Sequence, residues 1–342
     1  FLLLFCFTHN LHAQVDVHFM TFNVWQEGTS VPNGLTKIRD VIVKANPDII
    51  GFTEVRNYNT QDWTTKIVNE LSAVGLTYYR GYAGGDISLI SKYPILSSQL
   101  IGTAAAGFNI NIKNNTVVVA ITHLDYTYYA CYLPRGYNGG TPNWDMIDDG
   151  NGNPKPVTNV NTVLAYNLDS ERDEQIAAYV NFAKTKSLPL VLMGDFNEPS
   201  HLDWTAKTTT LFDHNGLVVP WHSTLTLKNN GFTDAYREFF PDEKLNPGIS
   251  WPSYAHEKGS TSWTPKSDER ERIDFIFHKG SNIKTKYVAL VGPKESYVKN
   301  VLSTTYTSNE NFIADNLPWP SDHKAVFATL TLATEVQPFA SV

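Results

Sequence analysis

The hydrophobic positions of this chain follow two alternating periods. One set has the i, i+3, i+4, i+7 spacing of an amphipathic helix. It consists of Ile38, Val41, Ile42 and Ala45, and Asn46-Pro47 ends the predicted helix. Similar spacing predicts helices around 67–74 and 176–183. Short apolar runs predict strands at 17–24, 48–52, 87–91, 116–122, 188–193, 272–277, 287–291 and 324–332. Helices that alternate with apolar strands are typical of an α/β protein with covered sheets.

Two stretches rich in glycine and proline interrupt this alternation. A long loop insertion is predicted at about 126–168, and a second stretch, which also contains tryptophan, covers 246–265. Loops of that length inside a compact domain are usually functional or mobile. The insertion is rich in aromatic rings, namely Tyr126, Tyr128, Tyr129, Tyr132, Tyr137 and Trp144. Such rings suit stacking on bases or sugars, contact with a lipid interface, or packing against the sheets, and all three remain open.

The charge balance narrows the range of partners. The 342 residues include 27 basic and 34 acidic side chains, which gives a net charge of −7. This is not a polybasic nucleic-acid wrapper, so a polyanionic substrate would need a local basic patch or a bound cation. A hydrophobic content of 42% with 18% charged residues excludes wholesale disorder, collagen and coiled coil.

The first residues form an apolar run, 1–7, that is too short to cross a bilayer. It is followed, near Gln14, by the small-residue pattern of a signal-peptide cleavage site. Residues 1–14 are therefore interpreted as a signal-peptide remnant, with a buried N-terminal strand as the alternative. The mature chain would then be secreted or periplasmic, and Cys131 would be its only cysteine. No disulfide framework or cysteine zinc cage would be available to it.

Acidic, amide and imidazole side chains recur where the predicted strands end or begin. They are Asn23, Glu54, His123, Asp195, Asn197, Asp274, Asp322 and His323. Strand ends at one edge of a sheet face one cleft, where α/β proteins usually bind ligands. Carboxylate and amide oxygens suit a hard divalent cation such as Mg²⁺ or Mn²⁺. The histidines suit a base or a stabiliser of charge.

Most of these residues have an ordinary explanation when taken alone. Asn23 and Gly-Asp-Phe-Asn at 194–197 suit turns or caps, and Glu54 is typical of a solvated acid. Asp274 differs because it lies among Ile and Phe, where an unpaired carboxylate would be costly. Ser-Asp-His at 321–323 suits a helix cap or part of a serine-hydrolase triad, but the chain has no Gly-x-Ser-x-Gly elbow.

The complete set of motifs resembles the endonuclease/exonuclease/phosphatase superfamily, which has the deoxyribonuclease-I-like fold. The motifs are Thr-Phe-Asn-Val-Trp at 21–25, Gly-Phe-Thr-Glu-Val at 51–55, Ile-Ser-Lys-Tyr-Pro-Ile at 90–95, Thr-His-Leu at 122–124, Gly-Asp-Phe-Asn at 194–197, Arg-Ile-Asp-Phe-Ile-Phe at 272–277 and Ser-Asp-His at 321–323. The match spans about 17–332. It implies an α/β protein, a four-layer α/β/β/α sandwich of two packed mixed sheets, formed as one catalytic domain over 15–335. The apolar start suggests a secreted, bacterial-type member.

The same resemblance implies a metal site. Glu54 resembles the principal metal ligand, with Asn23 and Asp322 near the same cation. The implied cofactor is Mg²⁺ or Mn²⁺, with Ca²⁺ as a third candidate. Asp195 and Asn197 resemble the pair that orients the attacking water and holds the phosphate.

The histidines carry the acid–base roles in this resemblance. His323 resembles the general base or phosphate-contacting histidine, and Asp274 the carboxylate that orients it. His123 resembles the second histidine, which stabilises the phosphorane charge or protonates the leaving group, with Asp86 as the acid that supports it. A cation offsets the charge of a phosphodiester, and a positioned base activates water.

The resemblance implies a divalent-metal-dependent phosphodiesterase, nuclease-like or acting on a small phosphodiester. A sphingomyelinase- or phospholipase-C-like enzyme is the alternative, and a non-catalytic binding module of the same fold is the third. The partner is therefore a phosphate ester of nucleic acid, lipid head group or small metabolite, and neither an obligate protein partner nor a transmembrane segment is inferred. Tyr126 and Arg172 are candidate substrate contacts, Arg172 being either structural or a phosphate clamp.

Overall fold

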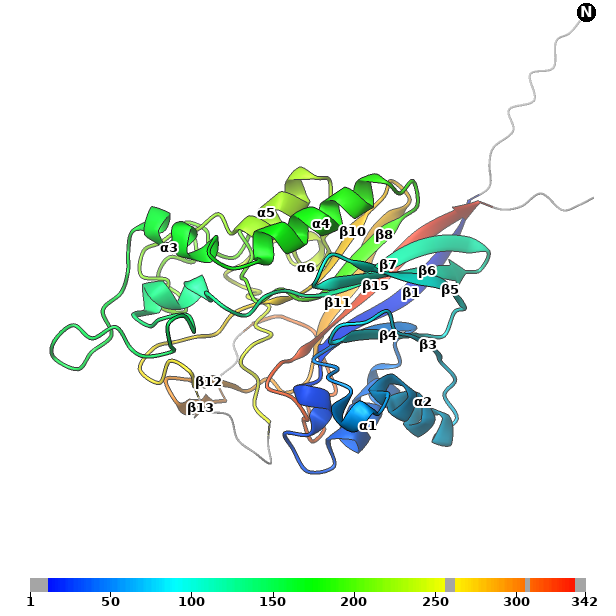
Figure 1. Cartoon of the computed structure of the whole chain (residues 1–342), viewed down its shortest axis with the longest axis horizontal. Coiled ribbons are helices and arrows are strands. Elements are labelled where there is room, and N and C mark those ends of the chain that lie inside the picture. The colour runs from blue at the N-terminus through cyan, green and yellow to red at the C-terminus, as the bar shows by residue number, and fades with distance from the viewer. Residues whose placement is uncertain (1–11, 256–261, 305–307, 336–342) are drawn as a thin grey trace, which may run out of the picture.

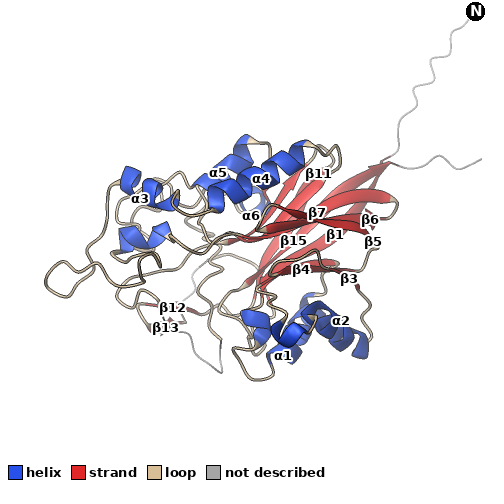
Figure 2. Ribbon diagram, viewed as in Figure 1, coloured by secondary structure: helices blue, strands red, loops and turns tan. Residues whose placement is uncertain are grey.

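Two β-sheets packed face to face form the centre of the molecule, and helices cover their outer faces (Figures 1 and 2). The structure is a computed structural model that describes residues 12–255, 262–304 and 308–335. The layers follow the order α/β/β/α, so the predicted fold class is confirmed. Of the predicted leader, residues 1–11 lie outside the described part and residues 12–14 begin the first strand.

The seven-stranded sheet is mixed. Its central strand β1 (His12–Asn23) runs parallel to β2 (Ile49–Thr53) and antiparallel to β15 (Ala325–Glu335). In spatial order the strands are β14 (Phe312–Ile313), β11 (Ile283–Val291), β15, β1, β2, β4 (Ile87–Ser91) and β3 (Tyr79–Gly81).

The six-stranded sheet is mixed as well. In it β7 (Asn115–His123) runs parallel to β8 (Leu190–Asp195), and β10 (Asp274–Lys279) runs antiparallel to β8. In spatial order the strands are β5 (Ile95–Ile101), β6 (Ala105–Ile112), β7, β8, β10 and β9 (Thr233–Asp234). A separate hairpin consists of β12 (Ser296–Val298) and β13 (Val301–Ser303).

The central strands are apolar on both faces because each face packs against a different layer. On β1, Val17 and Phe19 point into the core between the sheets, whereas Met20 and Phe22 lie under the helices of the outer layer. Strands β7 and β8 divide their side chains in the same way between the inner core and the opposite helical layer. This double burial explains why both strands are continuous hydrophobic runs in the sequence.

Each sheet has its own helical cover. On the seven-stranded sheet it consists of α1 (Gly34–Ala45) and α2 (Trp63–Ala73), and on the six-stranded sheet of α4 (Arg172–Lys184) and α5 (His222–Asn229). Asp62 caps α2, accepting a hydrogen bond from the backbone N–H of Thr65. The remaining helices are α3 (Val160–Asn167), α6 (Ala235–Phe239) and the 3₁₀ segments η1 (Gln26–Gly28), η2 (Tyr58–Thr60) and η3 (Ala130–Arg135).

The predicted helices correspond to α1, α2 and α4, and the predicted strands to β1, β2, β4, β7, β8, β10, β11 and β15. The periodicity did not predict the hairpin of β5 and β6. Strand β5 is an edge strand whose middle residues are exposed, and three of these, Ser97, Ser98 and Gln99, are polar, so no continuous apolar run marks it. In the described part of the chain, no helix has the length and hydrophobicity needed to cross a bilayer.

The insertion at 126–168 is more ordered than the predicted loop. It contains η3 and α3, and Tyr129, Cys131 and Tyr132 are buried. These side chains form one hydrophobic cluster with Trp204 and Trp251 from later segments. For the buried rings, packing against the rest of the protein is therefore the correct one of the three alternatives. The long loop insertion of the prediction thus contains two short helices, and aromatic burial supplies stabilising contacts that periodicity did not show.

Candidate active site

Strand register brings the predicted polar side chains to one edge of the two sheets. Asp195 at the end of β8 is the cross-strand partner of His123 at the end of β7 and of Asp274 at the start of β10. In the other sheet, Asn23 ends β1 and lies beside the end of β2, directly before Glu54. The parallel strands end, and the antiparallel ones begin, at the same edge.

His323 is held by contacts on both of its ring nitrogens. Its Nδ1 lies 2.9 Å from Oδ2 of Asp274, and its Nε2 lies 3.7 Å from Oδ2 of Asp195. The backbone N–H of His323 donates to Oγ of Ser321, and its carbonyl oxygen accepts from Nε1 of Trp319 at 2.7 Å. In the neutral ring, Nδ1–H donates to Asp274 and Nε2 is left as the free base position.

The electrostatic surroundings make His323 a strong proton acceptor. Burial disfavours its charged form, but the charges of Asp274 and Asp195 outweigh burial and raise the pKa of His323 to about 10. Burial raises the pKa of Asp195, which the charges of His323 and His123 oppose. In the protein without bound cations, His323 is therefore protonated at neutral pH.

His123 forms a second histidine–carboxylate pair on the other side of Asp195. Its Nδ1 lies 2.8 Å from Oδ2 of Asp86, and its Nε2 lies 3.7 Å from Oδ2 of Asp195. Burial opposes the charge on His123, but the hydrogen bond to Asp86 and the neighbouring acids raise its pKa to about 9. At neutral pH this imidazole carries a proton that it can donate.

Asn23 occupies the middle of the site but presents its amide nitrogen, not its oxygen. Nδ2 donates to Oε1 of Glu54 at 3.2 Å and to Oδ2 of Asp195 at 3.0 Å, and lies 3.4 Å from Nε2 of His323. The amide oxygen accepts from the backbone N–H of Trp25. The hydrogen-bond partners fix this amide orientation. Asn23 is therefore a donor that links the acids, and its place near the cation stays a prediction.

Glu54 and Asp322 form the acidic side of the site. Oε2 of Glu54 accepts from the backbone N–H of Gln26 at 2.9 Å and lies 3.9 Å from the Arg56 guanidinium. Burial raises the pKa of Asp322 to about 7, and the charges of Glu54 and Asp195 act in the same direction. Oδ1 of Asp322 is buried and has no hydrogen-bond partner among the described residues.

This acidic side fits a hard divalent cation. An unpartnered buried carboxylate oxygen beside further carboxylates is costly unless a cation neutralises it, and oxygen donors are those that Mg²⁺ and Mn²⁺ prefer. Asp195, Asp274 and His323 also offer ligand atoms that all lie within 4.8 Å of one another. Since Nδ1 of His323 is engaged by Asp274, Glu54 and Asp322 are the residues that could hold a cation here.

The Gly-Asp-Phe-Asn turn shapes the end of β8. Gly194 is required because a Cβ there would lie 1.8 Å from the carbonyl oxygen of Thr122 on β7. Oδ1 of Asp195 accepts from the backbone N–H of Asn197, whose side-chain Nδ2 donates to the Leu124 carbonyl oxygen at 2.9 Å. One N–H of the Asn197 amide is thus committed to the backbone, and the second is left for a ligand.

The two candidate substrate contacts lie in different surroundings. Arg172 is buried, and its terminal nitrogens donate to the carbonyl oxygens of Asp125, Thr127 and Tyr128 and to Oδ1 of Asn167. The structure therefore contradicts a phosphate clamp and supports the structural alternative, in which Arg172 ties the start of the insertion to α4. Tyr126 is 61% exposed and three residues beyond His123, and its contact with substrate stays a prediction.

Several supporting contacts were not predicted from the sequence. Arg56 binds Asp86 at 2.9 Å and so connects the two acidic parts of the site. Oγ of Ser321 donates to the carbonyl oxygen of Asn23, and Oγ of Ser250 accepts from the backbone N–H of Asp274 at 3.1 Å. Only the position of Arg56, two residues after Glu54, was a usable signal. Ser321 belongs to the Ser-Asp-His motif, but its contact with Asn23, like that of Ser250 with Asp274, spans a sequence separation that no local pattern shows.

Comparison with known proteins identifies the family. The model of the Endonuclease/Exonuclease/phosphatase family matches residues 20–323, and the chain belongs to this family. An uncharacterised protein of Caenorhabditis elegans is 28% identical over 325 residues, which cover 92% of this chain and 91% of that protein. Members of this family typically hydrolyse phosphodiester bonds.

Solved structures of similar fold extend over almost the whole chain. Truncated C. elegans TDP2 covers 93% of this chain and 98% of its own, with 16% identity and a TM-score of 0.51. D. rerio TDP2, solved with a single-stranded DNA product, covers 92% and 98%, with 13% identity and a TM-score of 0.51. An endonuclease/exonuclease/phosphatase from Beutenbergia cavernae covers 94% and 72%, with 16% identity and a TM-score of 0.53. These similarities establish the fold. They do not support a specifically secreted, bacterial-type member.

Proposed function

We propose that this chain is a divalent-metal-dependent phosphodiesterase in which His323 activates water. The observation that carries the proposal is the position of Asp195 between the Nε2 atoms of His323 and His123, 3.7 Å from each. Both Nδ1 atoms are held by carboxylates, so both Nε2 atoms face the same space. Two imidazoles on either side of one carboxylate suit a reaction that takes up one proton and delivers another.

The proposed reaction is attack of water on phosphorus with loss of one ester oxygen. His323 accepts the proton of the attacking water at Nε2, while Asp274 holds the ring and stabilises the resulting imidazolium. His123, protonated at neutral pH, donates its Nε2 proton to the leaving oxygen. A divalent cation at Glu54 and Asp322 would neutralise the acidic side, lower the pKa of His323 so that its base form is populated, and stabilise charge on the phosphate.

We infer that the phosphodiester belongs to a nucleic acid or a small nucleotide-like compound. The support is the similarity in fold to D. rerio TDP2, which has been solved with a single-stranded DNA product. The net charge of −7 works against a long duplex substrate and favours a short or single-stranded one. A lipid phosphodiester is the second candidate, favoured by exposed aromatic side chains such as Tyr126 and Trp263. A non-catalytic binding module is disfavoured because the residues of a complete site converge.

The decisive experiment is hydrolysis of bis-p-nitrophenyl phosphate by the purified chain after chelation, with and without added Mg²⁺, Mn²⁺ or Ca²⁺. We expect activity that EDTA abolishes and Mg²⁺ or Mn²⁺ restores. A parallel panel of single-stranded DNA, RNA and sphingomyelin distinguishes the two substrate candidates. Absence of hydrolysis with every ion and every substrate would refute the proposed function and favour the binding module.

A further inference from the structure

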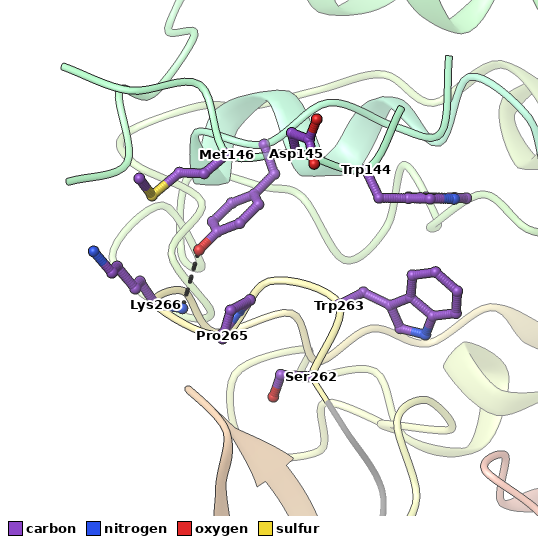
Figure 3. Close-up of a pocket in the computed structure, with 8 residues that line it drawn as sticks. Trp144, Asp145, Met146, Ser262, Trp263, Pro265 and Lys266 are labelled. Atoms are coloured by element: carbon purple, nitrogen blue, oxygen red, sulfur yellow. Dashed lines mark hydrogen bonds between the residues drawn. The ribbon is translucent and has the colours of Figure 1, made fainter. Parts of the chain in front are cut away.

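A cavity of about 530 Å³ lies between the insertion and the stretch that follows residue 261, outside the catalytic site (Figure 3). We call it the aromatic cavity. Its main lining residues are Tyr137, Trp144, Asp145, Met146, Trp263 and Lys266. A cavity of this size accommodates a group as large as a nucleoside, and its walls are mostly ring faces and apolar side chains.

The aromatic walls are held in place before any ligand binds. The rings of Trp144 and Trp263 lie 5.1 Å apart at an angle of 56°, and Trp144 also packs edge-on against the buried Tyr132 at 5.8 Å. Behind Trp144 the backbone comes so close at Gly140 that a Cβ there would lie 2.5 Å from the indole. Trp263 is 50% exposed, so part of one wall remains open to a stacking partner.

The aromatic cavity is lined by one side chain of each charge, Lys266 and Asp145. Nζ of Lys266 donates to the carbonyl oxygen of Gly152, which draws the ammonium group away from a ligand. The carboxylate of Asp145 has no hydrogen-bond partner among the described residues and is available as an acceptor. The two charges offset each other, so the lining gives no net attraction to a phosphate, whereas an uncharged ring with N–H donors would gain a charge-assisted hydrogen bond from Asp145. Ser262 adds a hydroxyl to the described lining, which can pair with a further polar atom of the ligand.

A series of aromatic rings connects the aromatic cavity to the catalytic histidine. The ring of Trp251 lies 6.5 Å from that of His323 and 6.4 Å from that of Tyr132, which contacts Trp144. The cavity is therefore no more than four ring-to-ring steps of 5.1–6.5 Å from His323. Tyr132 and Trp251 are buried, so a substrate that occupies both places would run outside this series of rings.

We propose that the aromatic cavity binds a nucleobase of a single-stranded nucleic acid whose scissile phosphodiester lies at His323. The base stacks on the exposed part of Trp263, which Trp144 contacts and supports, and its exocyclic amine donates to Asp145. Stacking on aromatic side chains accommodates every base, whereas the carboxylate favours bases with an exocyclic amine over thymine. This assignment rests on the proposed phosphodiesterase activity and adds to it a binding site for a base away from the scissile phosphodiester.

The test is a tryptophan-fluorescence titration with unlabelled hexamers of deoxycytidine and deoxythymidine, performed in the His323→Ala background so that the strands are not consumed. We expect quenching with tighter binding of the deoxycytidine hexamer. Trp263→Ala should weaken binding roughly 5- to 150-fold, the range for losing one base–aromatic stack. Asp145→Asn should remove the preference for deoxycytidine. The matched control is Tyr79→Ala on β3, an equally exposed ring outside the cavity, which should leave the affinity unchanged.

Two results would overturn the assignment: unchanged affinity in Trp263→Ala, or loss of affinity in Tyr79→Ala that equals the loss in Trp263→Ala. Tighter quenching by a monosaccharide or by choline than by either hexamer would show a different ligand and would also overturn it. Failure of the catalytic proposal is distinguishable, because bis-p-nitrophenyl phosphate is too small to reach from His323 to Trp263. A protein that binds the hexamers but does not hydrolyse this ester would retain the base site and lose the proposed reaction.

Discussion

Two clusters of buried ionisable side chains lie next to each other in this molecule, and they differ in how their charges are compensated. The active-site edge contains five carboxylates and two imidazoles, namely Glu54, Asp86, Asp195, Asp274, Asp322, His123 and His323. The second cluster, which we call the arginine network, contains three guanidinium groups and three carboxylates, namely Arg135, Arg237, Arg272, Asp203, Asp234 and Glu271. Arg272 is separated from Asp274 by a single residue.

The arginine network is balanced by close pairs. Arg135 lies 2.8 Å from Glu271, and Asp203 binds Arg237 at 2.7 Å and Arg272 at 2.8 Å. Arg135 also donates to the carbonyl oxygens of Cys131, Phe212 and Asp268, which binds the insertion to later segments. Such complete pairing is typical of a structural cluster.

The active-site edge has instead a surplus of acid and unpartnered oxygens. Oδ1 of Asp274 and Oδ1 of Asp322 are buried without a hydrogen-bond partner in the described part of the chain. Burial of charge alone therefore does not identify an active site. What distinguishes it is uncompensated charge of one sign, which a cation or a substrate can neutralise.

The largest expected effect is on kcat, and it tests whether His323 acts as a base or is only a buried histidine. His323→Ala should lower kcat for bis-p-nitrophenyl phosphate by about 10²–10⁴-fold, because it removes the base. The matched control is His278→Gln. His278 is a buried histidine of β10 that pairs with Glu238 of α6, and its replacement should leave kcat within about twofold. Thermal unfolding monitored by circular dichroism should show that both variants fold. Near-normal kcat in His323→Ala would remove His323 from the mechanism.

The next effect tests whether the arginine network is structural. Arg135→Met should lower the free energy of unfolding by about 3–5 kcal/mol, since Glu271 would be left buried without its cation. Urea denaturation measures this loss. The double variant Arg135→Met/Glu271→Gln should recover part of it, because the unpaired acid is also removed. A loss below about 1 kcal/mol in Arg135→Met would show that the balance of charges contributes little to stability.

A smaller effect, the change in the free energy of unfolding when Mg²⁺ binds, tests whether the surplus of acids at the active-site edge holds a cation. Mg²⁺ at about 100 times its Kd should raise the free energy of unfolding by about 2.7 kcal/mol, since it binds the folded state. Asp322→Asn should abolish this increase and, in EDTA, should be more stable than the parent, because the cost of burying the charged carboxylate is removed together with its repulsion from Glu54. Glu174→Gln, an exposed acid on α4, should behave like the parent. An unchanged response to Mg²⁺ in Asp322→Asn would argue against the assigned cation site.

The smallest effect concerns pH and a histidine beside the arginine network. Burial, together with the charge of Arg135, lowers the pKa of His214 to about 2, and its ring stacks on Trp204 with centroids 3.7 Å apart. The unfolded histidine binds a proton below about pH 6.5 while the folded one does not, so its contribution to stability is complete above pH 6.5 and is lost as pH falls.

His214→Phe keeps the stacked ring and removes the titration. We expect the parent to lose about 1.4 kcal/mol more than His214→Phe for each pH unit below about 6, measured by urea denaturation between pH 7.5 and 5. Parallel curves for the two proteins would contradict a neutral buried imidazole. Burial raises the pKa of Glu271 to about 7, so its contribution to the free energy of unfolding increases as pH falls. Glu271 is present in both proteins, so this contribution cancels in the comparison.

Much of the architecture could be predicted from periodicity and motifs, and the failures have physical causes. Helices α1, α2 and α4 and the central strands were predictable because each buries an apolar face of regular period. The insertion was not, since its order comes from aromatic contacts with Trp204 and Trp251, which lie about 70–120 residues further along the chain. Its local sequence, rich in glycine and proline, indicated a loop.

In the candidate site, too, some features were predictable from the sequence and others depended on contacts between distant segments. Residue types and order pointed to Glu54, Asp195 and His323, because hard-metal and acid–base chemistry need those groups. The orientation of Asn23 and the burial of Arg172 were decided by partners from other segments: the backbone N–H of Trp25 for the former, and four oxygens at the start and end of the insertion for the latter.

The amino-acid sequence alone determined which elements form and which chemistry their ends can supply, since both depend on local periodicity and on side-chain type. The tertiary structure decided which of two acidic clusters is left uncompensated, which side chains point into the site, and that an aromatic cavity forms beside it. These properties depend on distances between segments far apart in the chain, and strand register together with core packing sets those distances.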